Sequence, residues 1–180
     1  MNACDYALTL SKQSDENATV EHLDETINTP YADYGPFEVG DSVLYFTSTQ
    51  ATETPVAASP APAANSKKKK QQETEDLPPQ ITSTIKLYKA LHKDSSWVGK
   101  KELSSFYNAN GVENGNCNFS PDKKRFFFTR SVKTPEGNTY YDIYMSELKA
   151  GKWFQPVRMG DKVNVQGYNN TQPSFALSDK

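Results

Sequence analysis

The sequence predicts an all-β fold in which a four-stranded antiparallel unit is repeated along the chain, and three observations lead to this prediction. The chain of 180 residues is polar, with a hydrophobic share of only 36%, yet 12% of its residues are aromatic. Short apolar segments alternate with turn-forming residues. Two stretches of sequence also match each other at a constant spacing of 56 residues, which is typical of a structural repeat.

The repeat is most evident when residues 107–120 are set beside residues 163–176. Asn108 then matches Asn164, and Phe119 matches Phe175. The same ungapped frame pairs Leu87 with Ile143, Tyr88 with Tyr144, Trp97 with Trp153 and Leu103 with Met159. A partial third copy, offset by 82 residues, pairs Phe37, Tyr45, Phe46 and Thr47 with Phe119, Phe127, Phe128 and Thr129.

Each copy contains four segments with the character of β-strands. The first copy gives residues 35–39, 43–48, 84–90 and 97–103, and the second gives 116–120, 125–130, 140–147 and 153–159. A lone first strand of a further copy ends the chain. Residues 1–26 are acidic with mixed periodicity, and we expect a short helix or an irregular lead-in there.

Residues 51–80 differ in composition from both flanks. They are rich in proline and small residues, lack aromatic residues and include the run Lys67–Lys70, which predicts a disordered loop. The difference between the two offsets, 82 minus 56, is 26 residues and close to the length of this loop. We therefore expect a lead-in at 1–26, a first unit at 27–106 with an insertion at 51–80, a second unit at 107–162, and the start of a third at 163–180.

The run Phe126, Phe127 and Phe128 requires burial on both faces of its strand. A β-propeller blade is packed between two neighbours, so alternate rings can enter opposite interfaces. The sequence thus predicts a partial β-propeller of about two four-stranded blades plus the first strand of a third. Because two blades leave apolar faces uncovered, we expect a fragment of a longer protein or a chain that assembles with others, and the total blade number stays open.

The segments "FSPDKKRFFFTR", "YDIYMSELKAGKWFQPVRMG" and "VNVQGYNNTQPSF" resemble the WD40-like, TolB-type β-propeller repeat of Bacteroidetes cell-envelope proteins, including those of the OmpA family. The resemblance covers residues 27–180 except the insertion. It implies structural roles for the motif residues Phe119, Ser120, Pro121, Asp122, Phe127, Phe128, Asp142, Tyr144, Trp153, Phe37, Tyr45, Phe46, Tyr88 and Trp97. Two departures are Lys123, where the family has glycine, and Lys86, at the position matched by Asp142.

Charge and motifs argue against several classes of function. The net charge of -2 gives no basic field for nucleic acid. There is no phosphate-binding glycine loop, and we expect no cofactor. The two cysteines, Cys4 and Cys117, are far apart and do not form a metal motif, so we expect no metal site. Neither His22 nor His92 has a neighbour in sequence that suggests a catalytic pair, so we expect no enzyme activity.

Two polar positions and two tryptophans leave alternatives open. Asp122 and Asp142 are the paired carboxylates that a glycosidase would need, but we expect them to fix turns instead. Trp97 and Trp153 recur at one position of the repeat, which favours packing over a carbohydrate platform.

The expected function is a non-catalytic scaffold or protein-interaction module of the bacterial cell envelope. The resemblance implies a periplasmic or outer-membrane location, a protein or peptide partner, and peptidoglycan association through domains outside this chain. No segment approaches the apolar length of a transmembrane helix, and residues 1–10 lack the pattern of a signal peptide, so we expect either a cytoplasmic chain or, as the repeat favours, one whose true start lies upstream. An alternative is the propeller part of a prolyl-oligopeptidase-type peptidase whose catalytic domain is not in this chain.

Overall fold

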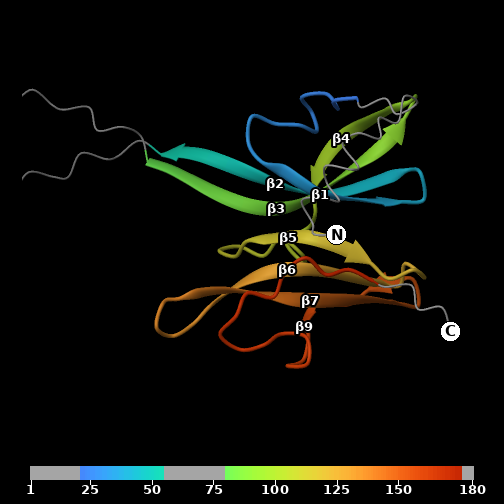
Figure 1. Cartoon of the computed structure of the whole chain (residues 1–180). Coiled ribbons are helices and arrows are strands. Elements are labelled where there is room, and N and C mark those ends of the chain that lie inside the picture. The colour runs from blue at the N-terminus through green and yellow to red at the C-terminus, as the bar shows by residue number, and fades with distance from the viewer. Residues whose placement is uncertain (1–20, 55–79, 176–180) are drawn as a thin grey trace, which may run out of the picture.

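The computed structural model describes residues 21–54 and 80–175. Over these residues the protein is all-β, with two antiparallel sheets that lie one above the other (Figure 1). None of the described residues form a helix long and apolar enough to cross a membrane. Because all the described elements are strands, the all-β prediction is confirmed.

The first sheet contains β1 (Asp33–Val39), β2 (Val43–Thr54), β3 (Gln80–Lys93) and β4 (Ser96–Glu102) in that order. The second contains β5 (Asn114–Phe119), β6 (Arg125–Lys133) and β7 (Thr139–Lys149), with β8 (Lys152–Trp153) and β9 (Val157–Arg158) both paired to β7. The predicted fourth strand of the second unit is thus split in two. Residues 171–175 form no strand, and neither sheet closes on itself.

The insertion is shorter than predicted. Strands β2 and β3 pair without interruption as far as Thr54 and Gln80, so the prediction of a loop at 51–80 is wrong at both edges. The stretch at 47–54 is rich in threonine, a good strand former, but a composition average over thirty residues hides it. Residues 55–79, with the Lys67–Lys70 run, lie outside the described residues, as does most of the predicted lead-in.

The phenylalanine run of β6 is buried on both faces of its strand. Phe126 and Phe128 belong to the core between the two sheets and are 2% and 0% exposed. Phe127 lies on the other face, where its ring centroid is 4.9 Å from that of Phe175. A second core lies on the outer face of the first sheet, built on Phe46 and covered by Ile27. Alternate burial therefore explains the sequence pattern.

A turn ending in asparagine recurs three times where the chain enters a new unit. The amide nitrogen of Asn28 donates to the carbonyl of Asp24 at 2.9 Å, that of Asn108 to Ser104 at 2.9 Å, and that of Asn164 to Gly160 at 3.0 Å. The last two asparagines are those matched in the sequence. These three asparagines thus share one local backbone turn.

The contact between the sheets, which we call the first junction, is also repeated. Tyr45 of β2 meets Phe119 of β5 with ring centroids 4.9 Å apart, and the amide of Asn116 donates to the hydroxyl of Thr47 at 2.8 Å. At the second junction, Phe127 and Thr129 of β6 meet the incoming segment 171–175. There the Phe175 ring lies at the same 4.9 Å, and the amide of Gln172 donates to Thr129 at 3.3 Å.

Candidate functional site

Most motif residues lie in the two cores or in the Ser-Pro-Asp turn, while Phe127 lies at the second junction and Asp142 in β7, and together they do not converge on one site. Sequence-matched aromatic pairs are in contact in both sheets. The ring centroids of Phe46 and Tyr88 lie 6.0 Å apart in a tilted pair, and those of Phe128 and Tyr144 lie 6.1 Å apart in a stacked pair. Phe37 joins the core between the sheets through Phe119. These residues build the framework.

The Ser-Pro-Asp turn between β5 and β6 is closed by its own side chains. Ser120 donates to a carboxylate oxygen of Asp122 at 2.5 Å, and the amide of Lys124 donates to the same oxygen at 3.1 Å. These two bonds, the Ser120 bond foremost, lower the pKa of Asp122. Lys123 takes the left-handed conformation with φ 57°, as does the matched Asp41 with φ 47°. The turn therefore forms with a non-glycine residue in a conformation that favours glycine.

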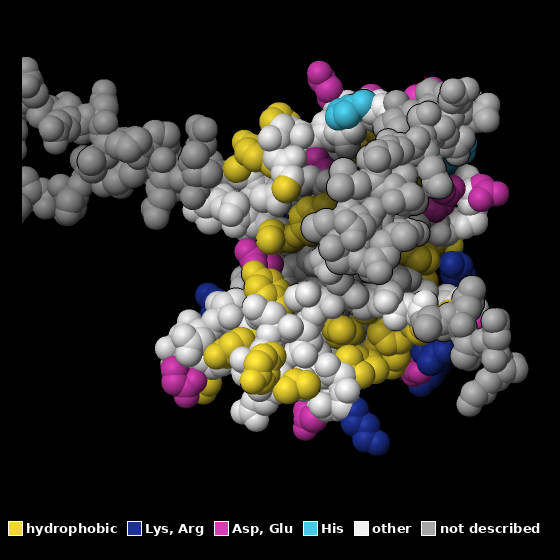
Figure 2. Space-filling view, viewed as in Figure 1, with side chains coloured by type: hydrophobic (Ala, Val, Ile, Leu, Met, Phe, Trp, Pro, Cys, Tyr) yellow, Lys and Arg dark blue, Asp and Glu magenta, His cyan; other side chains and the backbone are white. Residues whose placement is uncertain are grey.

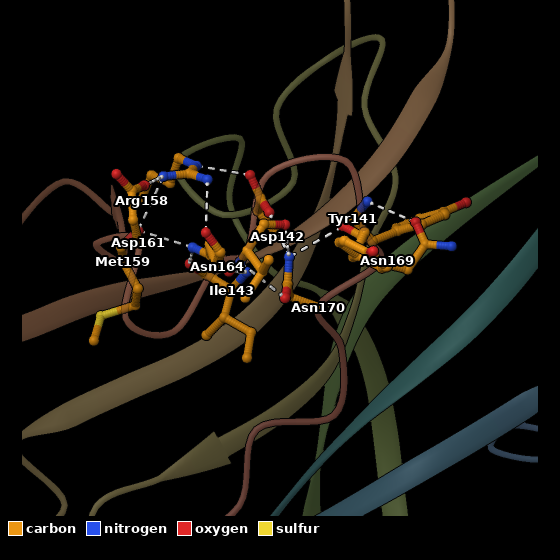
Figure 3. Close-up of polar contacts among 11 residues, drawn as sticks. Tyr141, Asp142, Ile143, Arg158, Met159, Asp161, Asn164, Asn169 and Asn170 are labelled. Carbon is orange, nitrogen blue, oxygen red and sulfur yellow. Dashed lines mark hydrogen bonds and ion pairs between the residues drawn. The ribbon is translucent and has the colours of Figure 1, made fainter.

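Asp142 of β7 lies in a polar cluster with Arg158, Asn164 and Asn170 (Figure 3). Its carboxylate accepts from Arg158 Nε at 2.7 Å and from Asn170 Nδ2 at 3.1 Å. Hydrogen bonds to Asp142 and then Asp161 raise the pKa of Arg158. In strand register Asp142 lies opposite Arg130, whereas Asp122 precedes the other end of β6. The two carboxylates are therefore not brought together as a catalytic pair.

The matched positions of the first sheet hold the same ion pair with its charges exchanged. Lys86 Nζ lies 2.8 Å from Glu102 Oε1, and these residues precede Asp142 and Arg158 by 56 positions. Lys86 therefore has an acidic partner in Glu102, as Asp142 has a basic one in Arg158. The pair links two neighbouring strands in each sheet.

Each sheet also has an asparagine clamp, which we define as one asparagine side chain bonded to both backbone groups of a single strand residue. The N–H of Leu87 donates to Asn108 Oδ1 at 2.9 Å, and Asn108 Nδ2 donates to the Leu87 carbonyl at 2.8 Å. Asn164 makes the same bonds with Ile143 at 2.7 and 2.9 Å. Sequence matching found these asparagines but not this role, which follows from the fixed spacing to a strand residue.

A cation lies over the aromatic pair of each sheet, a feature that sequence matching missed. Lys100 Nζ is 4.8 Å from the Tyr88 ring centroid, and the Arg130 guanidinium carbon is 4.9 Å from that of Tyr144. Lys100 also pairs with Asp33 at 3.2 Å, whereas Arg130 donates to the neutral Asn114 at 2.7 Å. Burial lowers the pKa of Arg130.

Among the described residues, the acidic partner Asp33 is found only beside the cation of the first sheet, and its own pKa is shifted. Burial alone would raise the pKa of this carboxyl, but hydrogen bonds from Ser48, Thr29 and Lys100 outweigh it, and the pKa is lowered. The cations come from different strands, β4 and β6, so no fixed offset relates them.

The histidines, tryptophans and described cysteine have packing or surface positions. His92 is exposed, and its ring is tilted against that of Trp97 with centroids 4.9 Å apart, while the ring centroid of Trp153 lies 6.1 Å from that of Phe119. Both tryptophans are partly buried against a core, which favours packing over a sugar platform. Cys117 is buried, and burial raises its pKa to about 12. Over residues 21–54 and 80–175, no three acidic, histidine or cysteine side chains gather to hold a metal ion.

A recess beside the first junction is the candidate binding surface, and we call it the junction groove. It encloses about 760 Å³ and is lined by Thr82, Thr84, Lys86, Glu113, Lys133 and Tyr141, among others. Figure 2 shows the sheets as two lobes with a notch between them, on the side from which the β2–β3 hairpin projects. A smaller recess of about 170 Å³ shares Glu113 and Tyr141 and adds Tyr34.

Glu113 and Tyr141 form the polar contact in the wall of this groove. The Tyr141 hydroxyl donates to the Glu113 carboxylate across 28 residues of sequence. This hydrogen bond, helped by burial, raises the pKa of Tyr141 to about 12. Sequence analysis missed the pair because neither residue belongs to the repeat pattern.

No protein-family model, no curated protein and no solved structure matches this chain.

Proposed function

We propose that this chain is a non-catalytic scaffold of the β-propeller type that binds a protein or peptide partner. The observation that carries the proposal is the repeated junction, in which a ring on the second strand of one sheet meets a ring of the incoming segment at 4.9 Å both times. Units that stack through one repeated contact form arrays whose connecting loops make a binding surface. The two sheets correspond in this proposal to two blades, and residues 171–175 to the start of a third.

The polar motif residues are hydrogen-bonded within the framework, which favours a non-catalytic role such as binding. Asp122 is engaged by its own turn, and Asp142 by Arg158 and Asn170. Asn108 and Asn164 are buried and bonded to strand backbone. A catalytic group needs a free lone pair or proton in a cleft, whereas these groups are occupied in holding the sheets.

The junction groove is the binding surface that we propose. Threonine hydroxyls of β3, the exposed amine of Lys133 and the carboxylate of Glu113 line it. An extended polypeptide presents alternating donors and acceptors together with charged side chains, and it can match such a wall. Glu113, held in place by Tyr141, would accept from a basic side chain of the partner.

Selection from a displayed library of random linear peptides against the full chain tests this proposal. We expect selected peptides to contain a basic residue and to lose roughly tenfold or more in affinity for Glu113→Gln and Lys133→Glu. Two matched controls should bind normally: Glu136→Gln, an exposed acid in the β6–β7 turn, and Lys124→Glu, at the other end of β6. Equal binding by all four variants, or no selected peptide, would contradict the proposal.

The location and the alternative function rest on the resemblance to TolB-type repeats. The proposal places the scaffold in the bacterial cell envelope, periplasmic or at the outer membrane, with peptidoglycan association through other domains. In the alternative, the chain gates a prolyl-oligopeptidase-type catalytic domain. Sequencing the reading frame on both sides separates them, because a peptidase requires a G-x-S-x-G strand-turn-helix and the envelope scaffold an OmpA-like segment.

A further inference from the structure

A further recess between the two sheets, which we call the aromatic pocket, is separate from the junction groove. It encloses about 320 Å³, and its walls include the rings of Tyr45, Tyr107, Phe119, Phe126 and Trp153. It shares no lining residue with the junction groove, because the two recesses lie at opposite ends of β3 and β5. A cavity of this size with mainly apolar walls and a few polar groups is typical of a small-molecule site.

The walls of the aromatic pocket come from both sheets and present ring surfaces to its interior. The Phe119 centroid lies 4.9 Å from that of Tyr45 and 4.6 Å from that of Phe126. Trp153 meets Phe119 edge-on, with an angle of 72° between the ring planes. Burial raises the pKa of the Tyr45 and Tyr107 hydroxyls, so these walls stay neutral at physiological pH. A planar aromatic group matches such walls in shape and polarity.

Two lysines give the pocket its positive charge. Lys89 of β3 and Lys101 of β4 both line it, and the two are direct partners in the β3–β4 pairing. Side chains directly opposite each other on antiparallel strands share a face, and like charges there repel. Glu102 also lines the pocket, but its carboxylate lies 2.8 Å from Lys86, which balances its charge. An anionic group between the two lysines would relieve their repulsion and gain charge-assisted hydrogen bonds.

We propose that the aromatic pocket binds a small molecule in which an aromatic ring carries a carboxylate. The ring would lie against Phe119 and Trp153, and the carboxylate would accept hydrogen bonds from Lys89 and Lys101. The ring walls then select for an aromatic group, and the lysine pair selects for a negative charge. The inference does not depend on the proposed peptide scaffold, because it concerns other residues and another class of ligand.

Magnetic resonance on the full chain tests the proposal with two probes of similar shape, 4-(trifluoromethyl)benzoate and the neutral 4-(trifluoromethyl)benzyl alcohol. Fluorine spectra give both affinities, and we expect the benzoate to bind roughly tenfold or more tightly than the alcohol. The indole N–H resonance of Trp153 should shift with added benzoate. That of Trp97, which packs against the other core, should stay in place. Equal affinities, or no shift at Trp153, would overturn the proposal.

Substitutions of the lysines provide a second readout. Lys89→Gln and Lys101→Gln should each weaken benzoate binding by roughly tenfold and leave alcohol binding unchanged. Neither should lower the melting temperature, because each removes one of two charges that repel. The matched control is Lys93→Gln, an exposed lysine at the end of β3 that does not line the pocket, and it should bind benzoate normally. Normal benzoate affinity in both pocket variants, or an equal loss in the control, would contradict the proposal.

Competition with acetate tests the contribution of the rings. Acetate carries the same charge without an aromatic group, so an equal concentration should not displace the benzoate from the pocket. If acetate does displace it, the ring walls contribute nothing to recognition and the proposal is wrong.

Discussion

The first and second junctions are built from matched residues, but the incoming segment belongs to a sheet only at the first junction. Ring centroids lie 4.9 Å apart in both, and a backbone amide reaches a threonine hydroxyl in both. Phe119 is nevertheless 6% exposed, whereas Phe175 is 36% exposed. The difference arises because β5 pairs with β6 and brings a whole sheet, while residues 171–175 form no strand. The contact is thus encoded locally, whereas its burial depends on the next sheet.

Truncating neighbouring phenylalanines of β6 should change stability most, because Phe126 lies in the core between the sheets and Phe127 at the less buried second junction. Phe126→Ala empties the core between the sheets and should cost about 3–5 kcal/mol of unfolding free energy. Phe127→Ala acts at the second junction and should cost roughly half as much, because its partner Phe175 is partly exposed. Urea unfolding of the full chain measures both. Equal costs would show that the second junction is as closed as the first.

The first junction has a close backbone approach at Gly115 that the second junction lacks, and this difference should give the next largest effect on stability. A Cβ added to Gly115 would lie 2.9 Å from the buried methyl of Thr47, so Gly115→Ala should cost about 1–3 kcal/mol. Gly160→Ala is the control, since a Cβ there meets no atom within 4 Å. The matched residue at the second junction is Thr171, which already carries a side chain. If Gly115→Ala behaved like Gly160→Ala, the first junction would be able to widen freely.

Features that lie in one ungapped frame could be predicted from the sequence, and features that arise from convergence in space could not. The burial of Phe126–Phe128 on both faces follows from local pattern, as does the matching of Asn108 with Asn164. Lys100 and Arg130 reach equivalent aromatic pairs from different strands, so no offset reveals them. The edges of the insertion were missed because threonine-rich strand ends resemble a polar loop in composition.

The Tyr141–Glu113 contact, in the wall of the junction groove beside the first junction, should give a smaller and pH-dependent effect on stability. Its hydrogen bond raises the pKa of Tyr141 to about 12, above the value of about 10 expected in the unfolded chain. A raised pKa stabilises the fold fully below pH 10 and loses its effect as pH rises towards 12. The stability difference between the native chain and Tyr141→Phe should therefore be constant below about pH 10 and shrink above it, which unfolding at a series of pH values measures. A difference that grew above pH 10 would contradict the assigned hydrogen bond.

The smallest expected change in stability concerns the β2–β3 and β6–β7 hairpins, whose connecting loops differ in length. Strands β6 and β7 are joined by residues 134–138, whereas β2 and β3 are joined by residues 55–79. Closure entropy grows only logarithmically with loop length, by about 0.6 kcal/mol for each doubling. Replacing residues 55–79 with the sequence of residues 134–138 should therefore raise the unfolding free energy by about 1.4 kcal/mol and leave both junctions intact. A loss of stability would mean that residues 55–79 contribute contacts of their own, and the two hairpins would then differ in packing as well as in length.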